Sequence, residues 1–160
     1  MQFEMPNEQQ KLNALVFGPS GNGKTKSIET LVPIGKVVAA NIEGGFLSIS
    51  DAITSGTIQS VKITEYKQFG EMIRELAMGG HGFETLVVDS GTELQKLYLD
   101  MIGGDKDMPT LQDYGKLANE TRRCLRFMRD LPMNLVYITL SKDEKDEQLG
   151  SVVRKPSLTG

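Results

Sequence analysis

Several residue types are scarce in this chain of 160 residues, and each scarcity excludes a class of protein. The single cysteine, Cys124, excludes an internal disulfide, and the sequence has no Cys/His cluster of the kind that binds zinc. No apolar run reaches the roughly 18 residues that a membrane span needs. The opening segment MQFEMPNEQQ lacks the basic and apolar regions of a signal peptide. We therefore expect a cytoplasmic protein without a membrane segment.

The charge balance restricts the kind of partner that the whole surface can bind. The formal net charge is −3, which argues against indiscriminate binding of nucleic acid but leaves a local basic patch open. With 39% hydrophobic and 24% charged residues, the composition is that of a globular protein. The length predicts one domain over residues 1–160 with a buried core.

Apolar runs alternate with helical patterns along the chain. Buried strands are predicted at 12–18, 36–43, 83–89 and 133–140. Helices are predicted at 24–31, 64–78, 91–102 and 111–131, with the first ended by Pro33 and the second capped by Thr64. The segment 51–63 is ambiguous, with a short strand at 58–63. Strands that are apolar on both faces predict an α/β fold, in which a mostly parallel sheet carries helices on both faces.

The segment GPSGNGKT directly follows the first predicted strand and opens the first predicted helix. It has the Gly-x-x-x-x-Gly-Lys-Thr spacing of a phosphate-binding loop, which requires this strand–loop–helix context. Glycines let the backbone N–H groups wrap around phosphate oxygens, and the helix N-terminus adds a favourable dipole. The motif predicts a nucleotide site formed by Gly18, Pro19, Ser20, Gly21, Asn22, Gly23, Lys24 and Thr25. Lys24 is expected on the β and γ phosphates and the Thr25 hydroxyl on Mg²⁺.

Two carboxylates are predicted to join this loop at the same edge of the sheet. Asp89 ends the apolar strand TLVVD, where it would hold the magnesium through water. Glu43 follows the strand at 36–42 and is our candidate for polarising the attacking water, the alternative being a solvated loop residue. Lys24, Glu43 and Asp89 are thus the expected catalytic residues.

Short segments along the chain, taken in order, match one family. They are GPSGNGKT, NIEGGFLSI, FETLVVDSGTEL, YGKL, MNLVYITL with its charged loop, and KPSLTG. Together, over roughly residues 12–160, they resemble the RecA-like P-loop ATPases of phages, AAA-type nucleotide-binding proteins associated with single-strand annealing and homologous recombination. Relatives continue into further strands after the position of PSLTG, so 1–160 is expected to lack them.

The resemblance implies hydrolysis of Mg-ATP coupled to single-stranded DNA, with a homo-oligomer as the expected assembly. Ring, filament and monomer stay open. It also implies that a polar residue closing the fourth strand, here Thr139 or Ser141, senses the γ-phosphate. Relatives often have Gln or His there. Arg154 and Lys155 are expected to reach the nucleotide of a neighbouring subunit, the alternative being an ordinary surface pair.

Two charged regions are open to more than one interpretation. The segment 141–150 is predicted to be a charged loop, and its excess of acidic residues favours a solvated loop over a DNA-facing one. Arg122, Arg126 and Arg129 recur on one helical face. That face is either solvated or tracks phosphates or a second subunit.

Other classes of nucleotide-binding protein compete with the ATPase. The segment SKDE at 141–144 has Ser and Glu where guanine-specific proteins have Asn and Asp, which argues against a GTPase. A small-molecule kinase shares the fold, although the acidic segment 141–150 suits a phosphate lid poorly. The third alternative is an ATP-binding assembly module with little turnover. These alternatives differ in what stimulates hydrolysis.

Overall fold

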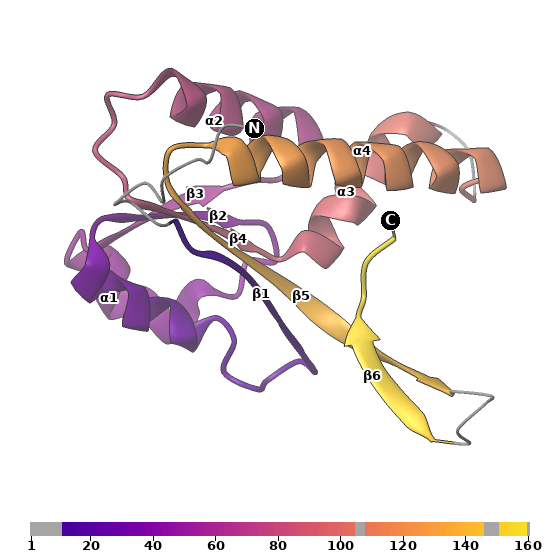
Figure 1. The fold of residues 1–160 in the computed structure, drawn as a ribbon, viewed down its shortest axis with the longest axis horizontal. Coiled ribbons are helices and arrows are strands. Elements are labelled where there is room, and N and C mark those ends of the chain that lie inside the picture. The colour runs from indigo at the N-terminus through magenta and orange to yellow at the C-terminus, as the bar shows by residue number, and fades with distance from the viewer. Residues whose placement is uncertain (1–10, 105–107, 146–150, 160) are drawn as a thin grey trace, which may run out of the picture.

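The computed structural model describes residues 11–104, 108–145 and 151–159. Within these residues six strands form one mostly parallel sheet (Figure 1). They are β1 (Asn13–Gly18), β2 (Val37–Asn41), β3 (Ile58–Lys62), β4 (Thr85–Asp89), β5 (Asn134–Lys145) and β6 (Val152–Pro156). The order across the sheet is β1-β5-β4-β2-β3, all parallel, and β6 runs antiparallel to the far end of β5.

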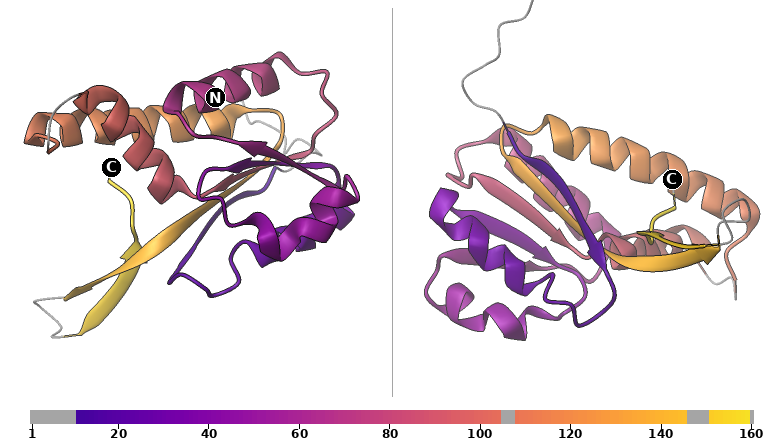
Figure 2. Two further views of the ribbon diagram at one scale, coloured as in Figure 1. Left: turned by 180° about the vertical axis from the view of Figure 1, so that it is seen from behind. Right: turned by 60° about the horizontal axis from the view of Figure 1, so that its bottom comes forward.

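Helices cover both faces of this sheet, which confirms the predicted α/β architecture (Figures 1 and 2). One face carries the 3₁₀ helices η1 (Lys26–Ile34) and η2 (Phe46–Ile49) with α1 (Ser50–Thr54). The opposite face carries α2 (Tyr66–Met78), α3 (Gly91–Gly103) and α4 (Leu111–Asp130). Among the helices of the described ranges, none combines the length and apolar character needed to cross a membrane.

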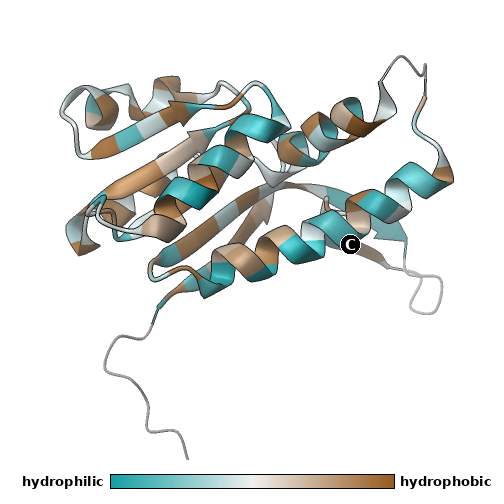
Figure 3. Ribbon diagram, turned by 90° about the horizontal axis from the view of Figure 1, so that it is seen from above, coloured by the Kyte–Doolittle hydropathy of each residue, from teal (hydrophilic) through white to brown (hydrophobic). Residues whose placement is uncertain are grey.

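Alternate residues of the central strands fill two separate cores. Val38 and Leu86 point to the α2–α4 face, whereas Val37 and Val87 point to the face of η1 and η2. All four side chains are at most 2% exposed. Figure 3 shows these strands as largely hydrophobic ribbons between helices in which hydrophobic and hydrophilic residues alternate. Burial on both faces is why the sequence has continuous apolar runs rather than alternating ones.

Capping boxes fix where α2 and α4 begin. In α4 the Thr110 hydroxyl accepts from Asp113 N, while Thr110 N donates to the Asp113 carboxylate at 2.9 Å. In α2 the cap is formed by Glu65 and Gln68, so the expected cap at Thr64 is wrong by one residue. Thr64 N also donates to Gln68 Oε1, at 2.9 Å, so Thr64 contacts the capping residue Gln68 without being the cap itself.

The first predicted helix differs in type and extent from the expectation. Residues 26–34 form a 3₁₀ helix that includes Pro33, so the expected stop before this proline is wrong. Pro33 is the second-last residue of η1, where its missing N–H removes a single hydrogen bond. Gly35 then ends the helix with φ of 141°, a conformation available mainly to glycine.

The segment predicted to be a loop at 141–150 is in part a strand. Residues 141–145 continue β5 and pair with β6, and residues 146–150 lie outside the described part of the chain. The resulting hairpin projects from the body of the molecule (Figure 1). Asp143 and Glu144 face Arg154 and Lys155 across it, so charges that favour a loop in isolation are paired between strands.

Strand β1 is at an edge of the sheet, although its apolar residues predicted a fully buried strand. Its one strand neighbour among the described residues is β5 (Figure 2). Leu15 is 46% exposed and Phe17 43% exposed, whereas Ala14 and Val16 pack against the core on the other face. Apolarity alone does not distinguish a central strand from an edge strand.

Candidate functional site

The phosphate loop runs from the end of β1 into η1. Gly21 and Gly23 have φ of +79° and +75°, in the left-handed region that other residues rarely adopt. These two conformations turn the chain back toward the sheet edge within a few residues. The strand–loop–helix context that the sequence predicted is therefore present, with a 3₁₀ helix in place of an α-helix.

The Lys24 side chain folds back over its own loop. Its Nζ donates to the carbonyl oxygens of Gly18 at 3.0 Å and Pro19 at 2.8 Å. The ammonium group is thereby held against the first two residues of the loop. The motif predicts that this charge contacts phosphate oxygens, which requires the ammonium group to leave these two carbonyl oxygens.

Thr25 and Asp89 meet at the base of the site. The Thr25 hydroxyl donates to Asp89 Oδ2 at 2.6 Å, although the two residues are 64 positions apart. Asp89 is 3% exposed, and this burial raises the pKa of its carboxyl group. The hydrogen bond from Thr25 and the charge of Lys24 act in the opposite direction and lower that pKa. A hydroxyl and a carboxylate in contact form a set of hard oxygen donors of the kind that Mg²⁺ prefers.

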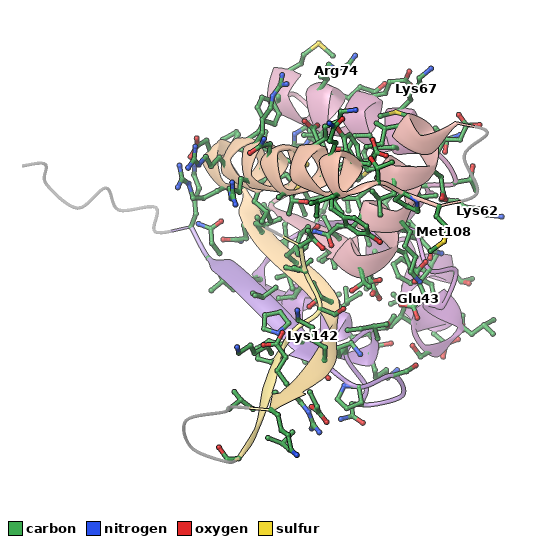
Figure 4. All side chains as sticks on the ribbon, turned by 90° about the vertical axis from the view of Figure 1, so that its right-hand side faces the viewer. Glu43, Lys62, Lys67, Arg74, Met108 and Lys142 are labelled. Carbon is green, nitrogen blue, oxygen red and sulfur yellow. The ribbon has the colours of Figure 1, made fainter. Side chains whose placement is uncertain are left out.

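Glu43 is tied to the same strand ends through the backbone. Ile42 N and Glu43 N donate to the Asp89 carbonyl oxygen at 2.8 and 3.4 Å. Asn41 Oδ1 accepts from Gly44 N at 2.8 Å, which tightens the turn after β2. The Glu43 side chain is exposed and points outward at this end of the molecule (Figure 4). Because β2 and β4 are direct neighbours, their carboxyl ends carry both acidic residues to one place.

These groups share one open cavity of about 280 Å³. It is lined by Ser20, Gly21, Gly23, Lys24, Thr25, Lys26, Glu43, Gly45, Ser48 and Asp89. Gly18 and Pro19 contribute through their contacts with Lys24, and Asn22 is not part of the lining. The structure therefore brings together residues from the phosphate loop and from the ends of β2 and β4.

Sequence reasoning missed Lys26, Gly45 and Ser48 in this cavity. Lys26 Nζ donates to Glu29 Oε1 at 2.7 Å and to the Ser48 carbonyl oxygen at 3.1 Å, which links η1 to η2. Lys26 directly follows the phosphate-loop motif, so its place in the cavity could have been predicted from the sequence. Nothing in the sequence marks Ser48, because η2 reaches the loop only through the turn after Glu43.

The remaining candidate residues do not line this cavity. Arg154 Nε lies 2.8 Å from Asp143 Oδ1, and Lys155 Nζ lies 2.7 Å from Glu144 Oε2, both on the hairpin. Ser141 pairs in register with Pro156 at the base of the hairpin. Thr139 is fully buried, and its hydroxyl has no hydrogen-bond partner within the described chain. Their suggested roles toward the nucleotide stay predictions.

Comparison with protein families adds an independent observation. The family model described as AAA domain matches residues 10–156. The chain belongs to this family. Membership indicates an AAA-type P-loop ATPase domain that binds nucleotide, in agreement with the parallel sheet and its phosphate loop. No curated protein matches the AAA domain described here.

Proposed function

We propose that this AAA domain binds Mg-ATP in the cavity at the ends of β1, β2 and β4 and hydrolyses its γ-phosphate. One observation carries the proposal. The phosphate loop, the Thr25–Asp89 pair and the Glu43 carboxylate belong to one cavity of about 280 Å³, although they come from three separate parts of the sequence. Phosphate binding, metal binding and activation of water are the three tasks that ATP hydrolysis needs.

The loop residues bind and orient the phosphates in this proposal. Backbone N–H groups between Gly18 and Thr25 surround the phosphate oxygens, and Lys24 leaves the two carbonyl oxygens it now contacts to bind the β and γ phosphates. Thr25 and Asp89 would hold Mg²⁺, which neutralises charge on the phosphates when bound. Burial of Asp89 strengthens its interaction with a cation, because little water competes for the carboxylate.

Glu43 accepts a proton from the attacking water. The backbone contacts to the Asp89 carbonyl oxygen fix the start of the Glu43 side chain, while its exposure leaves the carboxylate free to approach a water beyond the γ-phosphate. Thr139 or Ser141 would report the state of the γ-phosphate to the hairpin.

The coupling to single-stranded DNA, in phage recombination or replication, is the finer part of the proposal. Its support is the ordered set of motifs that resembles the RecA-like ATPases. A homo-oligomer fits this role, because Arg154 and Lys155 lie on a projecting hairpin that a neighbouring subunit could meet (Figure 1). In that arrangement one of them would leave its acidic partner for the neighbour's nucleotide.

Phosphate release from Mg-ATP, with and without single-stranded DNA, tests the proposal. We expect a basal rate that rises with DNA and that falls at least about 10²-fold in Lys24→Ala, since the loop then lacks its cation. Lys67→Ala on the exposed surface of α2 is the matched control and should keep the wild-type rate.

The competing functions give different results in the same assay. Stimulation by a small acceptor in place of DNA would indicate a kinase. Tight binding of ATP without release of phosphate would indicate an assembly module. A rate that is unchanged in Lys24→Ala would contradict the site itself.

A further inference from the structure

One threonine hydroxyl joins three elements at the base of the β5–β6 hairpin. Leu140 N donates to Thr92 Oγ1 at 3.1 Å, and this hydroxyl donates to the Ser157 carbonyl oxygen at 3.3 Å. Ser157 N in turn donates to the Leu140 carbonyl oxygen at 2.7 Å. These three hydrogen bonds link the first turn of α3 to β5 and to the residue that follows β6. We call Thr92, Leu140 and Ser157 the clasp.

The Thr92 hydroxyl replaces a strand neighbour that β5 loses at this point. β4 ends at Asp89, which pairs in register with Ile138, so β4 has no residue beside Leu140. On the other side of β5, Gly18 is the last residue of β1 and pairs with Leu140. A backbone N–H beyond the end of its neighbouring strand needs another acceptor. Thr92 supplies this acceptor from α3.

The clasp lies between the nucleotide site and the hairpin. Thr92 is three residues after Asp89, on the short connection from β4 into α3. Asp89 accepts a hydrogen bond from Thr25 of the phosphate loop at 2.6 Å. On the other side, the hairpin part of β5 begins directly after Leu140, and β6 ends directly before Ser157. Asp89 and the hairpin are therefore joined by a short path of covalent and hydrogen bonds through Thr92.

We infer that Thr92 is a positioning residue that couples occupancy of the nucleotide site to the stability of the hairpin against local opening. The inference rests on the proposed binding of Mg-ATP. A bound magnesium–nucleotide complex holds Asp89 and restricts the first turn of α3, which keeps the Thr92 hydroxyl on its two partners. The clasp and the hairpin then open less often. Such coupling needs no change of shape, because a ligand that restricts one local opening also restricts the openings linked to it.

The role of Thr92 can be separated from that of the binding residues, because Thr92 does not line the nucleotide cavity. Valine keeps the branched shape of the side chain but removes both hydrogen bonds of the hydroxyl. Serine keeps the hydroxyl and loses only a methyl group. Thr92→Val should therefore bind nucleotide with an uncoupled hairpin, whereas Thr92→Ser should stay coupled.

Hydrogen exchange in the hairpin, with and without nucleotide, tests the inference. The probe is adenosine 5′-(γ-thio)triphosphate with Mg²⁺, and calorimetry on the same samples measures its binding. In the wild type we expect exchange at the amides of 142–145 and 152–155 to slow at least about threefold at saturation. In Thr92→Val this slowing should be lost, while the affinity for the nucleotide stays within about threefold of wild type. Thr92→Ser should recover the slowing.

Thr57→Val is the matched control, since it also exchanges a threonine hydroxyl for a methyl group. Thr57 Oγ1 donates to the Ala52 carbonyl oxygen at 2.9 Å, between α1 and β3. This variant should keep the nucleotide-dependent slowing in the hairpin. Lys24→Ala acts at the nucleotide site itself and should lose both the binding and the slowing.

The Leu140 amide provides a readout that needs no variant. Its N–H is donated to the Thr92 hydroxyl, so in the wild type its exchange should slow together with that of the hairpin when nucleotide binds. The melting temperature of each variant confirms that it is folded.

The outcomes separate this inference from the proposed function. Failure of the wild type to bind the nucleotide would contradict both. Three results would contradict the coupling alone: binding without a change in hairpin exchange, slowing that persists in Thr92→Val, and slowing in the hairpin while the Leu140 amide is unchanged. Persistent slowing in Thr92→Val is the result expected if Arg154 on the hairpin contacts a nucleotide directly.

Discussion

Burial has two opposing effects on the Asp89 carboxylate. The carboxylate is almost fully buried, which costs free energy while it is charged, and the same burial increases its attraction for a cation. The Thr25 hydroxyl and the Lys24 ammonium offset part of the cost. The residue is therefore better suited to a bound metal–nucleotide complex than to the ligand-free protein.

Replacing Asp89 by Asn should separate stability from activity. The pKa of Asp89 is raised in the folded protein, so its stabilising contribution is present below the unfolded pKa of about 3.9 and is lost as pH rises through the folded pKa. At pH 7 Asp89→Asn should raise the melting temperature of the nucleotide-free protein by about 2–4 °C. The gain should disappear near pH 3, and ATP hydrolysis should fall about 10²-fold.

Thermal melts at several pH values, with phosphate release at pH 7, check this prediction. Thr25→Val is the companion variant, since it removes the donated hydrogen bond while Asp89 stays charged. It should lower the melting temperature. A variant Asp89→Asn that melts below the wild type at pH 7 would show that the hydrogen bond and Lys24 outweigh burial.

At the scale of the element, Asp89 lies at the junction where β4 ends and α3 begins. Gly91 opens α3 and lies against the ring of Tyr137 on β5, and a Cβ at this position would overlap the ring. Tyr137 is 4% exposed, and its ring would have to shift to admit a Cβ at Gly91. The glycine is thus required by packing, whereas φ > 0 is the requirement at Gly21 and Gly23.

Gly91→Ala should destabilise the protein by about 1–3 kcal/mol, the usual cost of overpacking a core. Gly103→Ala, at the other end of α3, is the matched control because its Cβ would meet no neighbouring atom. It should be neutral or slightly stabilising. Urea denaturation of both variants measures the difference. Equal stabilities would mean that the ring yields to the added methyl group.

The local sequence predicted where most helices and strands lie, but it did not predict which strands lie next to each other in the sheet. The phosphate loop is specified within eight residues. Glu43 and Asp89 could be associated with it because the carboxyl ends of parallel strands meet at one edge of the sheet. The position of β1 at an edge was not predictable, because it depends on pairing with β5, more than 100 residues away. The β5–β6 hairpin was missed because its charges are compensated across strands rather than along the chain.

At the scale of the molecule, the sheet should be most stable at its centre. β4 lies between β2 and β5, and all five of its residues are buried. The hairpin lies outside both cores, with exposed charges along it. Local opening is least costly where few apolar contacts are lost.

Native-state hydrogen exchange should therefore show the slowest amides in β4 and β2 and the fastest among strands in β6. Exchange in the hairpin should require only local opening, so its rate should be insensitive to low concentrations of urea, while exchange in β4 should accelerate with urea. Uniform rates over both elements would indicate that the hairpin unfolds only with the whole molecule.

The position of Lys24 over its own loop has a consequence for turnover. The ammonium group is held against the loop by two of the loop's own carbonyl oxygens. The backbone N–H groups of the loop and the Lys24 contact with the β phosphate serve ADP as well as ATP, so only the contact with the γ phosphate distinguishes the two nucleotides. We therefore expect strong inhibition by product, so that the ratio of ATP to ADP, rather than the ATP concentration alone, determines how much of the protein is in the triphosphate state.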